Sequence, residues 1–250
     1  MKRDFLFRTF FRGGIWSVVM SEISTKQLRS RGIMLQRDGS TYSVRFGTTG
    51  GRCSAQQLTE LAELCQKFGC GEIHLTVRQA IEIHHVPEAK IEEFIQACEK
   101  TTLLPARSGA RLRTIVACPG NKVCKFAQID SQAVAEEINT RFGQIESFPA
   151  KVKTAIAGCR NCCTRADFSD IGIVGTQNGQ YTLYAGGKGG RNFMPGTPIA
   201  VCESLDELMQ AIDELLRKYS SQAQPKERIG AWQAKNGDSF TQCNGIMEKG

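Results

Sequence analysis

Residues 113–124 read RTIVACPGNKVC and residues 151–163 read KVKTAIAGCRNCC, and these two stretches decide how the rest of the chain is interpreted. They hold two cysteine pairs with five and three intervening residues, set 35 positions apart: Cys118 with Cys124, and Cys159 with Cys163. Four thiolates on two converging loops are typical of a [4Fe–4S] site. Structural zinc is the first alternative, although its paired cysteines usually lie about two to four residues apart. A disulfide pairing is the second alternative.

The composition is that of an ordinary globular protein. The chain has 250 residues, of which 41% are hydrophobic and 23% charged, enough for one large domain or two small ones. Its 11 cysteines are an odd number, and no secretory signal is evident. Both observations argue against a disulfide framework and predict a cytoplasmic protein with metal chemistry. Cys65 and Cys98 lie in amphipathic patterns and are interpreted as small core residues.

The net charge of +7 is spread along the chain rather than gathered in a basic run. No stretch interleaves basic and aromatic residues as nucleic-acid modules do, and none is apolar for long enough to span a membrane. The mild basic excess therefore favours an anionic cofactor or substrate over nucleic acid or a membrane.

Both ends of the chain are predicted to lie outside the folded domains. Residues 1–31 are interpreted as a leader or N-terminal segment, in which Arg8 and Arg12 interrupt the apolar run and no cleavage site follows. Met20 reads like a natural start, so the residues before it are expected to be dispensable, with a surface helix as the alternative. Residues 222–250 form a polar tail with one helix around Trp232.

Residues 32–104 are predicted to form the first domain of an α+β fold. Alternating apolar residues indicate strands, and apolar residues at helical spacing indicate helices, with Ser54 as a cap and Gly69 as a stop. The predicted order is strand 41–46, helix 54–69, strands 72–77 and 79–86, and helix 87–100. This order matches most of a ferredoxin-like unit.

Residues 105–221 are predicted to form a second, α/β domain. Its predicted strands are 113–117, 151–157, 170–175 and 180–187, and its predicted helices are 124–142 and 204–219. The last two strands read as a hairpin around Asn178 and Gly179. Both cysteine pairs follow directly on strands, where loops can converge.

Taken together, these segments resemble the siroheme-dependent sulfite and nitrite reductase family, in particular its small, single-lobe, assimilatory-type sulfite reductases. The similarity runs from about residue 32 to residue 218. LTVRQAIEIHHV (75–86) resembles the family's Thr-x-Arg-Gln segment, and the two stretches quoted first resemble its two cysteine motifs, the second led by a Lys-x-Lys strand. DIGIVG (170–175) and YAGGKGGR (184–191) resemble the segments that follow.

The resemblance implies a ferredoxin-like half-domain followed by an α/β domain that binds siroheme and a [4Fe–4S] cluster. It makes Cys118, Cys124, Cys159 and Cys163 the cluster ligands, with Cys163 bridging to the siroheme iron and Cys162 as the competing bridge. Siroheme carries eight carboxylates, which need cationic and polar partners when buried. The resemblance assigns that role to Arg45, Arg78, Gln79, His84, Asn161, Lys188 and Arg191. For His84, an ordinary strand-edge residue is the alternative.

The resemblance also implies a small oxyanion substrate, sulfite or nitrite, whose oxygens leave as water. Lys151 and Lys153, two apart on a predicted strand, would face the same side and supply charge and protons; a solvated strand face is the alternative. Arg113 matches the family's active-site arginine. Six-electron reduction of sulfite to sulfide is expected, with nitrite reduction to ammonia, or a non-catalytic electron carrier, as alternatives. No flavin or nicotinamide motif is evident, so electrons are expected from an external ferredoxin-like donor.

Three departures from the family pattern stand out. Gly47 replaces an arginine expected to touch substrate, and Arg160 and Cys162 replace the usual Pro and Gly of the second cysteine motif. The larger members contain two such lobes and this chain contains one, so we expect a homodimer that restores the symmetry.

Overall fold

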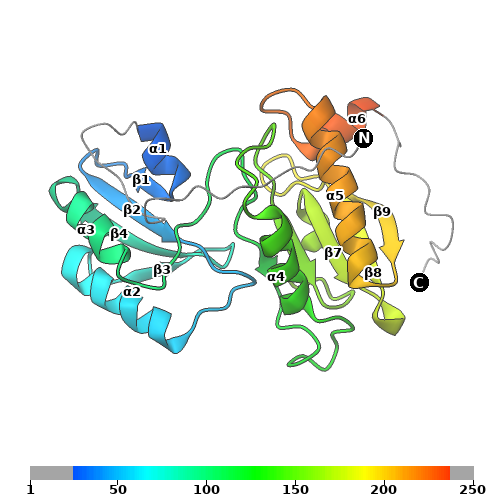
Figure 1. The fold of residues 1–250 in the computed structure, drawn as a ribbon, viewed down its shortest axis with the longest axis horizontal. Coiled ribbons are helices and arrows are strands. Elements are labelled where there is room, and N and C mark those ends of the chain that lie inside the picture. The colour runs from blue at the N-terminus through cyan, green and yellow to red at the C-terminus, as the bar shows by residue number, and fades with distance from the viewer. Residues whose placement is uncertain (1–24, 237–250) are drawn as a thin grey trace, which may run out of the picture. The chain divides into compact units, whose positions relative to one another are not determined.

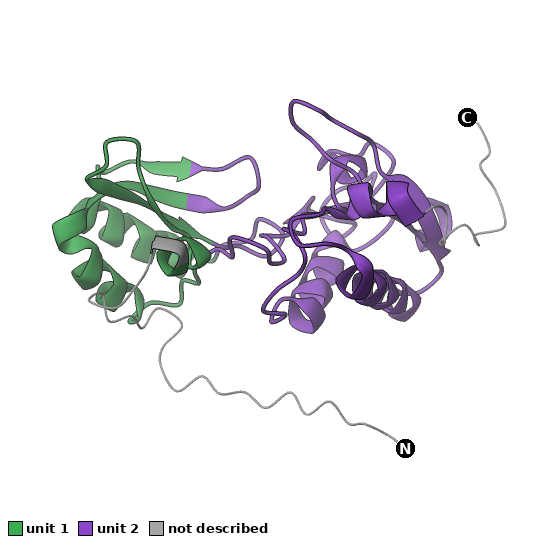
Figure 2. Cartoon of the chain, turned by 90° about the horizontal axis from the view of Figure 1, so that it is seen from above, with its two compact units in different colours: residues 1–46, 54–74, 82–105 green, residues 47–53, 75–81, 106–250 purple. Residues whose placement is uncertain are grey.

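The computed structural model describes residues 25–236, so most of the predicted leader, the end of the predicted tail and Cys243 lie outside the described residues. Contacts divide the chain into two compact units, coloured separately in Figure 2. Unit 1 comprises the residues up to 46 with 54–74 and 82–105, and unit 2 comprises 47–53, 75–81 and the residues from 106 onward. The units are interleaved along the chain, and the single division predicted after residue 104 stays a prediction.

Unit 1 is built on a four-stranded sheet in the order β1-β2-β4-β3. Its strands are β1 (Ile33–Leu35), β2 (Thr41–Phe46), β3 (Ile73–Leu75) and β4 (Ile81–Pro87), and its helices are α1 (Thr25–Ser30), α2 (Ala55–Phe68) and α3 (Ile91–Cys98), the last preceded by the 3₁₀ turn η2 (Glu88–Lys90). Ser54 caps α2 as predicted, because its hydroxyl accepts the Gln57 amide while the Gln57 side chain accepts the Ser54 amide. The core is aromatic: Phe94 of α3 lies 5.4 Å from Phe68 of α2, between ring centroids.

Unit 2 is built on a five-stranded sheet in the order β5-β6-β7-β8-β9. Its strands are β5 (Val116–Ala117), β6 (Thr154–Ala157), β7 (Ile171–Gly175), β8 (Tyr181–Ala185) and β9 (Thr197–Cys202), and its helices are α4 (Ser131–Phe142), α5 (Leu205–Gln222) and α6 (Ile229–Asn236), with the 3₁₀ turns η3 (Ala166–Phe168) and η4 (Gln177–Gly179). Strands β5, β6 and β7 run parallel, whereas β8 is antiparallel to both its neighbours. Helices α4 and α5 lie side by side against the sheet (Figure 1).

The two faces of this sheet carry side chains of different size. Ile156, Ile171 and Leu183 point toward the helices and join the main core of the unit. Their strand neighbours Ala155 and Ala157 point to the other face, in a small separate cluster. The cysteine loops leave the same end of the sheet because β5 and β6 are parallel.

The α+β class is confirmed and the predicted strands and helices are present, but β1 and β9 were not predicted and the strand predicted for 113–117 begins only at Val116. The helix predicted for 124–142 begins only at Ser131, because Asp130 accepts the amides of Gln132 and Ala133 and caps α4 there. The strand predicted for 151–157 begins at Thr154, and Val152 forms a single bridge to Leu112. The predicted helix around Trp232 is α6. Between residues 25 and 236, no helix has the length and apolar character to cross a membrane.

Candidate active site

Two loops, the first cysteine loop (residues 118–128) and the second cysteine loop (residues 158–165), are joined by main-chain contacts. The Gly158 amide donates to Cys118 Sγ at 3.0 Å, and the Gln128 amide donates to the Gly158 carbonyl at 2.6 Å. The approach is so close that a Cβ on Gly158 would lie 2.6 Å from the Cβ of Ala127. The first cysteine loop and the start of the second are therefore joined at Cys118 and Gly158, and the convergence of all four predicted ligands stays a prediction.

The cysteines of these loops are the type of donor that an iron–sulfur cluster needs. Cys118, Cys124, Cys159 and Cys163 carry free thiols, which removes the disulfide alternative for these two pairs. Cys118, Cys124 and Cys159 are half-buried and Cys163 is exposed. In the described part of the chain, no three His, Cys, Asp or Glu side chains gather in a metal-binding geometry. The bond from an amide to Cys118 Sγ is of the kind that tunes cluster sulfurs, so thiolate ligation of [4Fe–4S] suits this donor set.

Cys162 and Cys163 differ in how they are held. Cys162 has a φ of 47°, in the left-handed region that favours glycine. Its thiol lies 3.4 Å from an oxygen of Asp167, and burial raises the pKa of that thiol. The Cys163 side chain is exposed instead. This arrangement supports Cys163 over Cys162 as the ligand.

A group of basic side chains lies beside the starts of β5 and β6. We call it the cation cluster, and its members are Arg78, Arg113, Lys151, Lys153 and Arg228. Arg78 donates from one terminal nitrogen to the carbonyls of Thr114 (2.9 Å) and Thr154 (3.1 Å). Its Nε is buried and has no hydrogen-bond partner among residues 25–236. A buried orphan donor of this kind indicates a missing anionic or polar group.

Charge within the cation cluster is poorly balanced. Burial lowers the pKa of Arg78 to about 10, with the charges of Arg113 and Arg228 acting in the same direction. Burial likewise lowers the pKa of Lys153, helped by Arg78, Arg228 and Lys151. Asp170 is the carboxylate that opposes both shifts. An anion bound here would be stabilised by all of these cations.

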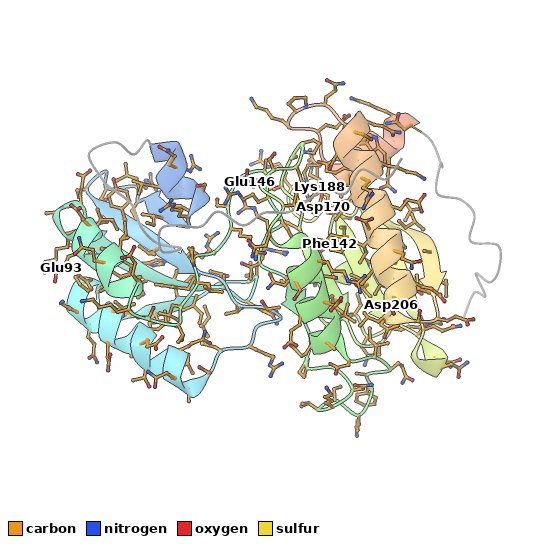
Figure 3. The ribbon with its side chains drawn as sticks, viewed as in Figure 1. Glu93, Phe142, Glu146, Asp170, Lys188 and Asp206 are labelled. Atoms are coloured by element: carbon orange, nitrogen blue, oxygen red, sulfur yellow. The ribbon has the colours of Figure 1, made fainter. Side chains whose placement is uncertain are left out.

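Asp170 and Arg228 were not predicted from the sequence, and they form the anchor of the cation cluster. Asp170, at the start of β7 and labelled in Figure 3, is 1% exposed. Arg228 donates to its two oxygens at 2.8 and 2.6 Å, and the main-chain amide of Lys153 donates to it at 2.8 Å. The carboxylate therefore fixes the backbone of the predicted proton donor. Its sequence signal was a lone acid before an apolar strand, which carries little information.

Gln79, Arg45 and His84 already have protein partners. The Gln79 amide exchanges two hydrogen bonds, each of 2.9 Å, with the main chain of Ala117 and so holds the turn 76–80 onto β5. In unit 1, Arg45 pairs with the buried Glu82 at 2.5 Å and His84 lies 3.1 Å from the same carboxylate. Burial alone would raise the pKa of Glu82, but the hydrogen bonds from His84 and Arg45 lower it.

The remaining predicted residues lie on exposed loops of unit 2. Asn161 is exposed in the second cysteine loop, and Arg191 is exposed after the glycines that follow β8. Lys188, labelled in Figure 3, pairs with Met194 through two main-chain hydrogen bonds of 2.7 Å, which close this glycine-rich loop. No described side chain forms an ion pair with Lys188 or Arg191. Their roles toward a cofactor stay predictions.

An α/β unit with two cysteine loops, in the same chain as a ferredoxin-like half-domain, is typical of an iron–sulfur oxidoreductase. The profile of the nitrite and sulphite reductase 4Fe-4S domain matches residues 108–238, and that of the nitrite/sulfite reductase ferredoxin-like half domain matches residues 34–101. The chain belongs to the siroheme-dependent nitrite and sulfite reductase family, and its cofactors are siroheme and a [4Fe–4S] cluster.

Relatives of both substrate types are similar to this chain. It is 29% identical over 208 residues to the assimilatory-type sulfite reductase of Nitratidesulfovibrio vulgaris, covering 83% of this chain and 93% of that protein. It is also 29% identical over 209 residues to the NAD(P)H nitrite reductase of Bacillus subtilis, of which it spans only 25%. Among solved structures, the Mycobacterium tuberculosis NirA protein has the same fold, with a TM-score of 0.70 and 20% identity over 90% of this chain and 46% of that one.

Proposed function

We propose that this protein reduces sulfite to sulfide, taking six electrons from an external ferredoxin-like donor. The observation that carries the proposal is the unbalanced cation cluster in the same unit as the two cysteine loops. Arg78 and Lys153 each lie close to several other cations and to the carboxylate of Asp170, which is already paired with Arg228. The choice of sulfite is supported by the similarity to the assimilatory-type sulfite reductase along 93% of that protein.

Four cysteines would hold the cluster: Cys118, Cys124, Cys159 and Cys163. Arg78, with its orphan Nε, would bind a siroheme carboxylate, and Lys188 and Arg191 are free to do the same from their glycine-rich loop. When bound, the coupled centre supplies electrons to the substrate atom. Arg45, Gln79, His84 and Asn161 keep their predicted cofactor role as part of this proposal.

The protein's own part is to bind the oxyanion and to deliver protons. Reduction of sulfite to hydrogen sulfide consumes six electrons and eight protons and releases three waters. Lys151 is exposed and Lys153 is half-buried, so both can exchange protons with water, while Arg113 would supply fixed charge. The lowered pKa of Lys153 brings that ammonium closer to the range in which it can give up a proton.

The first test is the optical spectrum of protein prepared anaerobically in a host that makes siroheme. Isobacteriochlorin bands that shift when sulfite or cyanide is added are expected. Iron–sulfur absorbance alone would refute the siroheme site. Sulfite and nitrite are then compared at matched, subsaturating concentrations with one reduced dye, and faster nitrite turnover would make ammonia formation the correct reaction.

The substitution at Gly47 supports a second candidate, a non-catalytic electron carrier. Gly47 begins the loop 47–53, which is tied to the turn of Arg78 because the Thr48 hydroxyl donates to the Gln79 carbonyl. An arginine at this position would add a cation to the substrate site. If the wild-type holoprotein shows the spectrum but no turnover, and Gly47→Arg restores turnover, the carrier function is favoured.

We also propose a cytoplasmic homodimer. The single lobe of this chain motivates the dimer, since pairing two copies would supply the missing half. Sedimentation of the cofactor-loaded protein as a monomer would contradict the dimer.

A further inference from the structure

The two cysteine loops form an exposed surface that is both basic and apolar. Residues 119–128 and 159–165 contain four Lys or Arg and no acid. We call their exposed side chains the loop surface, and its members are Lys122, Val123, Lys125, Phe126, Arg160 and Arg165. Val123 is 78% exposed and Phe126 is 56% exposed, so the first cysteine loop presents two large apolar side chains close together in the sequence.

The charges of the loop surface are available to a partner. Lys122 pairs with Asp130 at 2.6 Å, but Lys125, Arg160 and Arg165 form no ion pair among residues 25–236. Lys125 Nζ lies 5.0 Å from the centroid of the Phe126 ring, so an apolar side chain and a cation are presented together. Three cations without ion pairs on the two joined loops, one of them at an exposed aromatic ring, match an acidic protein with an apolar contact point.

The loop surface is also held firmly enough to bind without reorganisation. The Cys124 amide donates to the Gly120 carbonyl at 2.8 Å, and the Asn121 amide donates to the Ile129 carbonyl at 3.0 Å. Gly120 has a φ of 77°, and a Cβ there would lie 2.8 Å from the Ser131 amide nitrogen. The hydrogen bonds between the two cysteine loops, from the Gly158 amide to Cys118 Sγ and from the Gln128 amide to the Gly158 carbonyl, also hold this surface in place. A pre-organised surface loses little entropy on association.

We propose that the loop surface is the docking site for a small acidic protein that carries one electron at a time. This inference rests on the proposed function, which needs an external electron source. In each encounter the carrier is oxidised by one electron and this protein is reduced by one, and six encounters serve one sulfite. Because Val123 and Phe126 flank Cys124, a partner covering them would sit directly over a predicted cluster ligand.

The composition of the loop surface also predicts how tightly the carrier binds. A few cations and two apolar side chains make a small contact, typical of transient redox encounters. Electrostatic attraction mainly speeds association and weakens as salt is added. We therefore expect a complex that forms quickly and weakens as salt is added. The cations would attract the carrier, and Val123 and Phe126 would fix its orientation on the loop surface.

The test uses the holoprotein with an acidic [2Fe–2S] ferredoxin as the probe. The variants are Lys125→Glu and Phe126→Ala, and the matched control is Lys100→Glu, an exposed lysine of unit 1 with the same charge change. The affinity for ferredoxin is measured by titration, and sulfite turnover is measured separately with a reduced small-molecule dye. Both loop variants are expected to weaken ferredoxin binding about tenfold. The control is expected to bind normally, and dye-driven turnover should stay within about twofold of wild type in all three proteins.

The outcomes test the docking site separately from the proposed reductase function. Unchanged ferredoxin affinity in both loop variants would refute the docking site, as would equal weakening in Lys100→Glu. A DNA duplex that binds the loop surface as tightly as ferredoxin would also refute it. If wild-type protein binds ferredoxin through these residues but turns over neither anion with dye, the docking site stands and the reductase proposal fails.

Discussion

Replacing Asp170 by asparagine should remove a large part of the stability of unit 2 while keeping the shape of the side chain. Asp170 is 1% exposed and holds both Arg228 bonds, of 2.8 and 2.6 Å. Removing one partner of a buried ion pair leaves the other charge uncompensated, at a cost of about 3–5 kcal/mol. For a protein of this size each kcal/mol lowers Tm by about 2–4 °C, so a fall of at least about 6 °C is expected.

Thermal and urea unfolding of the Asp170→Asn variant would measure this loss. Asp213→Asn is the matched control, because Asp213 pairs with Arg217 at 2.7 Å on the surface of α5 and its side chain is 43% exposed. The control should change stability by less than about 1 kcal/mol. Replacing both Asp170 and Arg228 by apolar residues should recover much of the loss. In one contrary outcome, Asp170→Asn costs no more stability than Asp213→Asn. In the other, the double replacement costs the sum of the losses caused by replacing Asp170 and Arg228 separately. Either result would show that the Asp170–Arg228 pair does not stabilise unit 2 as argued above.

The same variant should also shift the pH dependence of turnover. Asp170 raises the pKa of Lys153 against the effects of burial and three neighbouring cations. Without that carboxylate the pKa of Lys153 falls further, so the ammonium loses its proton at lower pH. Since Lys153 must be protonated to donate, the alkaline decline in rate should begin at lower pH. An unshifted profile with normal folding would show that Lys153 does not donate.

Three further predictions concern the cysteine loops and the support beneath them. Cys163→Ala should abolish bound iron and sulfide, whereas Cys162→Gly, which suits the φ of 47°, should retain both; the reverse result would make Cys162 the ligand. Gly158→Ala should impair cluster loading without unfolding the protein, because its Cβ would meet that of Ala127 at 2.6 Å, and normal iron content would contradict this. Tyr219→Phe should cost about 1–3 kcal/mol in urea unfolding, since its hydroxyl donates to a carbonyl at 2.6 Å and accepts an amide at 3.1 Å; a neutral result would mean that water replaces both bonds.

Local chemistry made much of the fold predictable. The helix after Ser54 was predicted with its cap because the capping box lies within four residues of the chain. The start of α4 was missed although Asp130 is a capping residue, because Phe126 and Ile129 extend the helical spacing of apolar residues into the first cysteine loop. Where two local signals compete, the sequence does not say which one prevails.

Sequence reasoning could propose the site residues that lie close to the cysteines, and it missed residues that come from far away in the chain. The cysteine pairs, Lys153 and Arg113 occur in recognisable stretches. Arg228 lies 58 positions from Asp170, in a segment interpreted as a polar tail, and only the folded structure brings them together. Glu82 was likewise missed, because a single acid in an apolar strand gives no sign that it will pair with Arg45.

The unequal faces of the unit 2 sheet bear on how the finished protein is made. The larger core, in which Ile156, Ile173 and Leu183 pack beneath Leu208 and Ile212 of α5, contains none of the predicted cofactor ligands. Small metal-dependent domains, by contrast, stay unfolded until the metal arrives. We therefore expect the newly synthesised polypeptide to fold before it is loaded. A cell could then keep a reserve of folded, inactive chains and convert them to active protein when iron, sulfide and the tetrapyrrole are supplied.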